Sequence, residues 1–336
     1  MTHCLDAAPG TVHWGYFDRS LSPVLTVRSG DVVDVVTLTH HAGDIPDLMM
    51  DDGVRAVYAG VPDRGPGPHI LTGPIAVAGA RPGDTLEVRV VQLTPRLDVG
   101  ANLAAPWGYL AERFPADRIT AFRIEPDGVA AVAEFSFERP PGPADPGRIV
   151  PPASVTRVPA LRGVRVPLRL HFGVIGLAPA APGRVSSVPP RPFGGNVDNW
   201  RFGVGARMFY PVQVEGALLS LGDPHAAQGD GELSGTALEA SLNGRIQVIL
   251  HHDCPVRTPV LETDLEWMTH GFGDTLNEAM RDAAEAMLDL LVGRFGLSGA
   301  DAYALCSVAV DFGVTQVVDQ RLGVHAALPK SVLARG

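Results

Sequence analysis

At 336 residues the chain is long enough to bury a large core, as one unit or as two to three closely packed subdomains. Its 27 basic and 37 acidic residues give a formal net charge of -10, which offers no electrostatic footprint for nucleic acid or an anionic membrane. The N-terminus lacks the features of a signal peptide, and no segment has the roughly 18 continuous apolar residues of a membrane helix. We therefore expect a cytoplasmic protein without nucleic-acid or membrane partners.

Residue usage narrows the fold class and the chemistry. The 38 glycines and 30 prolines indicate many turns between short strands, as in a β-rich protein. Cys4, Cys254 and Cys306 are odd in number and far apart, so we expect reduced thiols rather than disulfides or a zinc ribbon. The one lysine, Lys330, is a candidate for a role that needs a compact amine, although a surface lysine is the simpler interpretation.

Two N-terminal segments, residues 24–38 and 75–93, repeat one pattern. Each runs an apolar strand into a Gly-Asp pair, Gly30-Asp31 or Gly83-Asp84, and continues as an alternating strand. The alternation and the turn residues predict two β-hairpins of a barrel or sandwich, with a structural role for the Gly-Asp pairs. Pro-rich stretches near 138–168 and 178–193 are interpreted as surface connections or an oligomer arm.

The run "GALLSLGDPHAAQGDGELSGTALE", residues 216–239, begins like a third copy of this pattern and then departs from it. No return strand follows Gly222-Asp223, and polar residues accumulate instead. Where the local pattern and the expected fold disagree, a functional site is the favoured explanation. The polar residues of this run are Asp223, His225, Gln228, Asp230, Glu232 and Glu239.

A glycine pair precedes Asn196 and Asp198 in "FGGNVDNW" and allows a tight bend that presents both side chains to a ligand, although a plain turn uses the same residues. The C-terminal part changes character. Apolar spacing over residues 275–293 predicts a helix that begins at a Thr275/Glu278 capping box and stops at Gly293. A second helix after Ser298 and a strand over residues 313–319 complete a small α/β unit, with Met280, Met287 and Cys306 expected in its core.

The chain lacks the motifs of serine hydrolases, P-loop proteins, dinucleotide-binding folds and zincins. Histidine and carboxylate chemistry remains. A divalent ion with an open position lowers the pKa of its bound water, and a nearby carboxylate serves as general base. A simpler interpretation is that the carboxylates cap turns and that the histidines are structural. His40, His41 and His69 at strand ends are further candidates for the site, whereas His251 and His252 are interpreted as surface residues.

Four segments carry a resemblance: "GPHILTGPIAVAGARPGDTLEVRV", "FGGNVDNW", "GDPHAAQGDGELSGTALE" and "DAYALCSVAVDFGVTQVVDQRLGVHAALPK". They look like successive signatures of the acetamidase/formamidase family. The resemblance implies a β-rich fold with a small C-terminal α/β unit, a homo-oligomer, and hydrolysis of short amides to ammonia and a carboxylate. Val197 replaces a methionine of the family pattern, and Ser234 stands where relatives often carry a cysteine. The family's polar pattern falls on Asn196, Asp198, Asp223, His225, Gln228, Asp230, Glu232, Glu239 and Lys330.

We therefore expect a mainly β fold, with a barrel or sandwich core over residues 1–250 and an α/β subdomain over 251–336. The expected activity is hydrolysis of the C–N bond of a small aliphatic amide, formamide or acetamide. In this interpretation Glu232 or Asp230 is the base, Gln228 or Asn196 orients the amide, and Lys330 stabilises an oxyanion or orients a carboxylate. The expected ligands of a divalent ion, with zinc favoured and calcium possible, are Asp198, His225, His69 and Asp223.

Two alternatives stay open on the sequence. One is hydrolysis of another C–N bond, as in a urea or a carbamate. The other is a non-catalytic β-barrel protein in which the oxygen-rich run holds a structural calcium, since Asp223, Asp230, Glu232 and Asn196 suit that ion at least as well as zinc.

Overall fold

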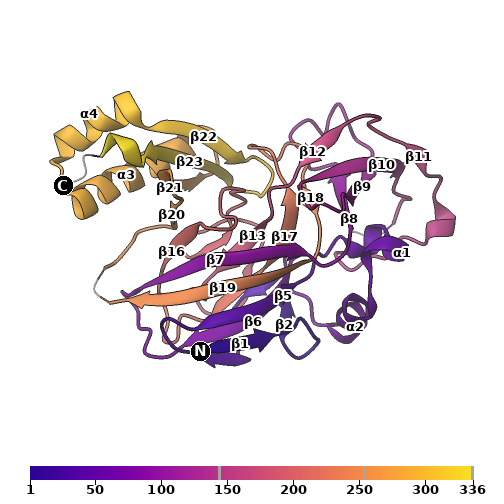
Figure 1. Cartoon of the computed structure of the whole chain (residues 1–336), viewed down its shortest axis with the longest axis horizontal. Helices are drawn as coiled ribbons and strands as arrows, with labels where there is room; N and C mark the ends of the chain where they lie inside the picture. The colour runs from indigo at the N-terminus through magenta and orange to yellow at the C-terminus, as the bar shows by residue number, and fades with distance from the viewer. Residues whose placement is uncertain (143–144, 253, 334–336) are drawn as a thin grey trace.

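The computed structural model describes residues 1–142, 145–252 and 254–333. Most of the regular structure is β, in two large sheets, and the expectation of a mainly β fold is confirmed (Figure 1). The strand path of each large sheet has two free ends among the described residues, so the structure is a sandwich of open sheets and the closed barrel expected as an alternative is absent there. The helices of the described residues are too short or too polar to span a membrane.

The first sheet has nine strands, which in spatial order are β1 (Thr2–Leu5), β5 (Val32–Thr37), β19 (Leu242–His251), β7 (Thr85–Pro95), β16 (Arg207–Pro211), β20 (Val260–Glu262), β21 (Glu266–Gly273), β23 (Leu322–Pro329) and β22 (Asp311–Gln316). Strands from both ends of the chain thus belong to one sheet. Apart from the parallel pair of β1 and β5, its neighbours are antiparallel.

The second sheet has twelve strands. Its main path is β11 (Val158–Pro159), β10 (Ala130–Glu138), β9 (Arg118–Ile124), β8 (Val99–Ala104), β18 (Leu238–Glu239), β17 (Leu219–Ala227), β13 (His171–Gly176) and β15 (Gly194–Asn196). Four strands branch from this path: β2 (Val12–Trp14), β4 (Leu25–Val27), β6 (Ile70–Val77) and β12 (Arg165–Pro167). A separate pair is formed by β3 (Tyr16–Phe17) and β14 (Val185–Ser186).

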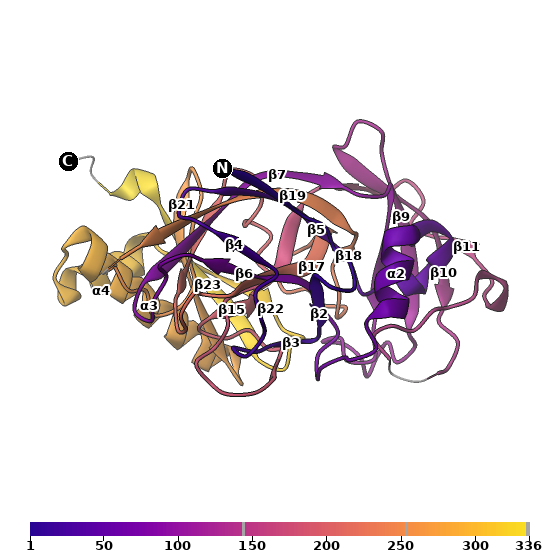
Figure 2. The same ribbon diagram turned by 90° about the horizontal axis from the view of Figure 1, so that it is seen from below.

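The main core lies between the two sheets. Val33, Leu86 and Ile246 from the first sheet pack with Ile75 and Leu221 from the second, and each is fully buried. Burial of apolar side chains from both inner faces is the main stabilising term of a sandwich. A second core lies under the short helices α1 (Pro46–Met49) and α2 (Asp52–Gly60), at the end of the molecule opposite the C-terminal helices (Figures 1 and 2).

The two predicted hairpins are wrong in their pairing. β4 pairs with β6 and β5 pairs with β19, so the Gly30-Asp31 turn joins the two sheets rather than two neighbouring strands. The turn at Gly83-Asp84 does the same between β6 and β7. The expected structural role of the Gly-Asp pairs fits their contacts, because Asp31 and Asp84 each accept a hydrogen bond from a backbone N–H three residues earlier, at 3.0 and 2.9 Å. Alternation identifies a half-buried strand but not its neighbour.

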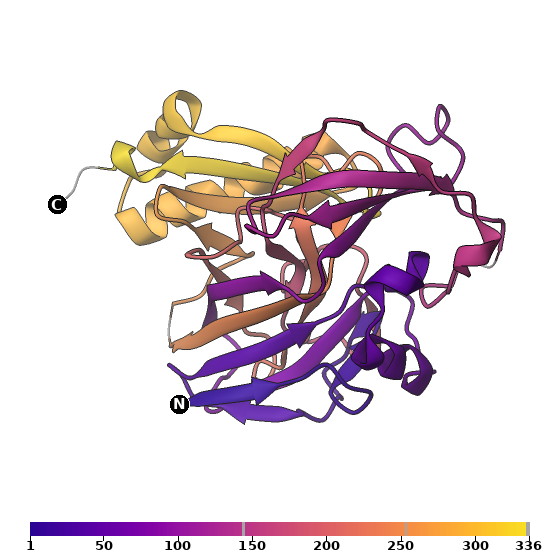
Figure 3. The ribbon, with the colours of Figure 1, turned by 45° about the vertical axis from the view of Figure 1, so that its right-hand side comes forward.

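The C-terminal helices α3 (Leu276–Phe295) and α4 (Gly299–Ala309) pack on β21 and β23 at one end of the molecule (Figure 3). The predicted capping box is present, with Glu278 N–H donating to the Thr275 hydroxyl. The predicted helix stop is wrong: the helix continues through Gly293 and ends at Gly296, whose φ of 69° is the left-handed cap that glycine provides. Met280, expected in the core, is 48% exposed.

The expected burial of Met287 and Cys306 is confirmed. The four strands that accompany the helices continue the nine-stranded sheet, and the division of the chain at residue 250 stays a prediction. Three short 3-10 helices complete the described elements, at Ala42–Asp44, Pro152–Ser154 and Lys330–Val332.

Candidate active site

Strand β17 supplies the centre of the site. All nine of its residues are buried, and successive side chains of a strand point to opposite faces, so Asp223 and His225 share one face. The neighbouring strands bring partners into register. His171 of β13 and Glu239 of β18 lie opposite His225, and His69 immediately precedes β6. The polar run that interrupts the expected hairpin is therefore part of a buried strand that polar residues surround.

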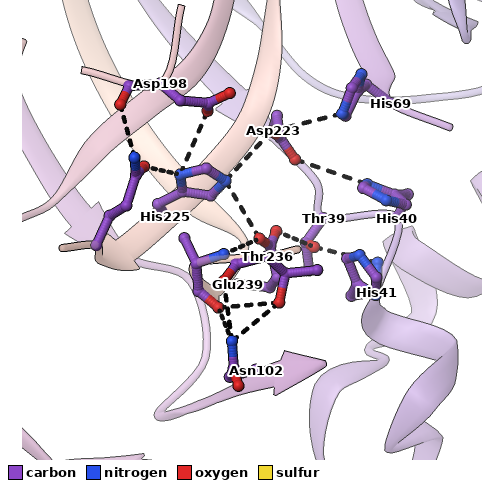
Figure 4. A network of polar contacts seen from close by, with 12 residues as sticks. Thr39, His40, His41, His69, Asn102, Asp198, Asp223, His225, Thr236 and Glu239 are labelled. Carbon is purple, nitrogen blue, oxygen red and sulfur yellow. Dashed lines mark hydrogen bonds and ion pairs between the residues drawn. The ribbon is translucent and has the colours of Figure 1, made fainter. Parts of the chain in front are cut away.

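Imidazoles and carboxylates converge on Asp223 (Figure 4). His225 Nε2 lies 3.2 Å from both Asp223 Oδ2 and Glu239 Oε1. His69 Nε2 lies 3.6 Å from Asp223 Oδ2, and His40 Nδ1 lies 3.6 Å from Asp223 Oδ1. Asp223 Oδ1, His40 Nδ1 and His225 Nε2 have no hydrogen-bond partner among the described residues, so the contacts of these atoms are close without being hydrogen bonds. Buried polar atoms without partners are costly, so a bound cation or an ordered water molecule at this point would stabilise the arrangement.

Outer contacts fix the orientation of these imidazoles. The Ser187 hydroxyl lies 2.8 Å from His69 Nδ1, which leaves Nε2 turned towards Asp223. Gln228 Oε1 lies 3.1 Å from His225 Nδ1, and Gln228 Nε2 donates to the Asp198 carbonyl oxygen at 2.6 Å. A hydrogen bond to one ring nitrogen that leaves the other free towards the site is the usual arrangement around a metal-bound histidine.

A second set of carboxyl groups, Asp198, Glu232 and Asp319, lies beside the histidines. Each is at most 9% exposed, and both carboxylate oxygens of Asp198 lack a hydrogen-bond partner among the described residues. Burial raises the pKa of Asp198 to about 7, an increase that His225 partly offsets. Burial, together with the charge of Asp198, also raises the pKa values of Glu232 and Asp319 well above their usual range. These groups therefore retain protons near neutral pH.

Asp223 and His225 behave in the opposite sense and form a charged pair. Burial opposes ionisation of Asp223, but the neighbouring His69 and His225 lower its pKa below the usual value. Burial likewise opposes the charged form of His225, and Glu239 and Asp223 raise its pKa well above the usual value. Desolvation lowers the pKa values of His40 and His69, so both are neutral near pH 7 and have a free lone pair.

The site residues line a cavity of about 240 Å³, whose walls include His40, His69, Asn196, Asp223, Glu232 and Asp319. Three groups bring their ligand atoms within 4.8 Å of one another: His40, His69 and Asp223; Asp198, His225 and Glu232; and Asp223, His225 and Glu239. Two ligand atoms of a tetrahedral zinc site lie about 3.3–3.6 Å apart, given metal–ligand distances of about 2.0–2.2 Å. The separations of 3.2 and 3.6 Å around Asp223 are close to these values.

The structure brings most of the predicted site residues together. Asp198, His69, Asp223, His225 and Glu232 lie in the cluster, Asn196 lines the same cavity, and Gln228 borders it. Two predicted residues lie elsewhere. The Asp230 side chain is 38% exposed and forms an ion pair with Arg201 at 2.8 Å. Lys330 forms an ion pair with Glu262 at 2.6 Å in the first sheet.

Several site residues were not proposed from the sequence. Asp319 comes from the loop between β22 and β23, and His171 comes from β13. Gly173 leaves room for the cluster, since a Cβ atom there would lie 2.8 Å from Asp223 Oδ2 and 2.7 Å from His225 Cε1. An isolated Asp, His or Gly at a strand carries no local signal of such a role, so only the fold identifies these three.

Comparisons with known proteins identify related sequences. Residues 13–184 and 180–334 match the sequence model of the Acetamidase/Formamidase family. The acetamidase of Mycolicibacterium smegmatis is 32% identical over 268 residues, which cover 68% of this chain and 62% of that protein. The chain thus spans less than two thirds of that relative's length.

Solved structures show the same fold over the whole chain. An acetamidase from Bacillus halodurans superposes with a TM-score of 0.78 at 28% identity and covers 98% of both chains. An acetamidase from Yersinia enterocolitica superposes with a TM-score of 0.79 at 26% identity, over 100% of this chain and 94% of that one. Because the family match extends over almost the entire sequence, the chain belongs to the acetamidase/formamidase family.

Proposed function

We propose that this chain hydrolyses the C–N bond of a small aliphatic amide, formamide or acetamide, to ammonia and a carboxylate. Family membership and the acetamidase and formamidase names of its relatives support this reaction. The observation that carries the proposal is the convergence of unpartnered buried nitrogen and oxygen atoms on Asp223 inside a cavity of about 240 Å³. Such a concave site with strongly shifted pKa values is typical of catalysis.

A divalent cation is part of the proposal. Asp223, His69 and His225 remain its proposed ligands, with His40 in addition beside the second carboxylate oxygen of Asp223. Asp198 keeps its proposed place among the ligands through its contact with His225. Imidazole nitrogens favour zinc, whereas a calcium site is built from oxygen atoms. When bound, the cation polarises the amide carbonyl and lowers the pKa of a water molecule.

The remaining polar groups of the cavity transfer protons and orient the amide. Glu232 lies beside Asp198 and shares the cavity with Asp319, and the raised pKa values of these carboxyl groups keep a proton available near neutral pH. In its ionised form one such group would accept a proton from the attacking water, and a protonated neighbour would deliver one to the departing nitrogen. The Asn196 Oδ1 atom has no hydrogen-bond partner among the described residues, which supports the proposal that it accepts an N–H of the amide. A homo-oligomeric assembly and a cytoplasmic location also remain proposals.

Replacement of Asp223 tests the site with a matched control. Asp223→Asn keeps the shape of the side chain and removes the charge that the three histidines surround, so we expect the rate of ammonia release from acetamide to fall at least a hundredfold and the bound metal to be lost. Asp230→Asn changes an exposed residue held by Arg201, and we expect turnover within about threefold of the unmodified protein.

Metal content, melting temperature and ammonia release are measured on both variants. Normal turnover by a folded Asp223→Asn protein would exclude this cluster as the active site. A loss confined to Asp230→Asn would instead support the role first predicted for Asp230 from the sequence.

A further inference from the structure

A second, larger cavity adjoins the proposed active site. It measures about 530 Å³, against about 240 Å³ for the cavity that holds the cluster. Pockets of about 300–1,000 Å³ usually hold molecules much larger than formamide or acetamide. The size of this second cavity is therefore not explained by the smallest amides.

The two cavities share walls. Glu232 and Thr236 line both, and Gln228 lines the larger one while its side chain contacts His225 in the cluster. The two cavities therefore adjoin at these residues.

The walls of the two cavities differ in chemistry. The smaller cavity presents imidazole and carboxyl groups. The larger one has apolar wall residues, among them Phe122, Ala227 and Leu238 of one buried apolar cluster and the half-buried Val166, beside polar ones that include Asn102, Arg169 and Asp230. A molecule with a polar head and an apolar chain matches this pair of cavities, because each part meets a wall of its own kind.

The segment that borders both cavities is held by hydrogen bonds. Asn102 Nδ2 donates to the Ser234 hydroxyl at 3.0 Å and to the Thr236 carbonyl oxygen at 2.9 Å, and Leu103 N–H donates to the Thr236 hydroxyl at 2.8 Å. These bonds tie the loop that follows Glu232 to strand β8, so the cavity is formed before any ligand enters. A preformed cavity binds a chain without the cost of ordering its own walls.

We propose that the larger cavity binds the acyl chain of primary amides longer than acetamide, with the amide group at Glu232 and the chain between Phe122 and Val166. This inference rests on the proposed amide hydrolysis and assigns its preferred substrate class, unbranched aliphatic amides of medium length. Each buried methylene group increases affinity by up to about fourfold. We expect kcat/KM to rise at least tenfold from acetamide to hexanamide.

A pair of valine substitutions tests the cavity itself. Val166→Trp places a bulky ring in the larger cavity, away from the residues of the cluster. Val164→Trp makes the same change two residues earlier, at a side chain that is 42% exposed and outside the cavity lining. We expect Val166→Trp to lower kcat/KM for hexanamide at least tenfold and to leave acetamide within about twofold, while Val164→Trp changes neither.

Binding of the product carboxylates tests the larger cavity without any catalytic step. Calorimetry with acetate and hexanoate on the unmodified protein is expected to give at least tenfold tighter binding of hexanoate, lost in Val166→Trp alone. Equal affinities for the two carboxylates, or hexanoate binding that Val166→Trp leaves intact, would overturn the acyl-chain cavity whatever the turnover. Absence of turnover on every amide, with hexanoate still preferred, would overturn the proposed hydrolysis and leave the cavity assignment supported.

Discussion

Three carboxylate residues of the site share an unusual backbone conformation. Asp198, Asp223 and Glu232 have φ values of 52°, 49° and 47°, in the left-handed region that favours glycine. A non-glycine residue held there costs on the order of 1–3 kcal/mol and persists only where its surroundings enforce it. This conformation directs all three side chains into the buried cluster. Strain concentrated at the proposed ligands and proton carriers is consistent with selection for their position rather than for stability.

The shifted pKa values predict how the stability of the metal-free protein depends on pH. The pKa of Asp198 is raised from 3.8 to about 7 in the folded state, so the unfolded chain releases this proton at lower pH. The stabilising contribution of the protonated form is complete below about pH 4 and is lost as pH rises through 7. Glu232 and Asp319 are shifted in the same direction. The lowered pKa of Asp223 has the opposite sign, but its contribution is already constant above pH 5. The buried histidines with lowered pKa values also have the opposite sign, and their contribution increases as pH rises towards 6.5, so the effect of Asp198 has to be measured against a variant.

We therefore expect the chelator-treated protein to lose melting temperature relative to a chelator-treated Asp198→Asn variant between pH 5 and pH 8, by roughly several degrees, since three pKa units correspond to at most about 4 kcal/mol. Saturating zinc should remove this loss, because the cation takes the place of the protons. Differential scanning calorimetry at pH 5 and pH 8 measures these melting temperatures. If the unmodified protein and the Asp198→Asn variant changed in parallel between the two pH values, Asp198 would not be protonated in the folded state.

The alternation of β17 predicted the direction of two site residues. Asp223 and His225 follow the period of two and lie on one face, whereas Asp230 lies beyond the end of the strand, where alternation no longer fixes its direction. Arg201 and Trp200 hold it at the surface. Lys330 was a candidate because it is the one lysine of the chain, and the rarity of a residue type gives no information about where the fold places it. Asp319 reaches the cluster from the first sheet, a contact that no local pattern encodes.

At the scale of elements, the segment that replaces the expected return strand is clamped between the sheets. Gly231 N–H donates to the Thr315 carbonyl oxygen at 2.9 Å beside β22. On the other side, Ala105 N–H donates to the Ser234 carbonyl oxygen at 2.9 Å next to β8. Glu232 lies between these two anchor points. The disrupted hairpin predicted from the sequence thus corresponds to a loop that spans two sheets and positions a buried carboxyl group.

Strand β13 makes room for the site through a residue without a side chain, Gly173. Gly173 faces the cluster, and a Cβ atom there would displace Asp223 and His225 from their contact. We expect Gly173→Ala to lower amide turnover at least a hundredfold, with a loss of stability of about 1–3 kcal/mol from overpacking. Gly299→Ala at the start of α4 is the matched control, since its added Cβ meets open space, and we expect unchanged turnover.

Turnover and melting temperature are measured on both glycine variants. If Gly173→Ala retained normal ammonia release, the close approach of Asp223 and His225 to β13 would be irrelevant to the activity.

At the scale of the whole molecule, the cluster forms where distant parts of the chain meet. His40 follows β5 of the first sheet, Asp223 lies in β17 of the second, and Asp319 comes from the C-terminal strands. The mainly β class was predictable, because turn residues and alternating strands are local features. The pairing was not: the segments around Gly30 and Gly83 look like hairpins, yet each joins one sheet to the other. Strand neighbours are decided by packing between residues far apart in sequence.

The most direct measurement is ammonia release by the purified protein from formamide, acetamide, propionamide and urea, before and after chelation and with zinc or calcium returned. We expect release from the amides that disappears with the metal and is restored by zinc. Release that persists after demonstrated metal removal would contradict the role of the cation, and silence on every amide with metal bound would contradict amide hydrolysis.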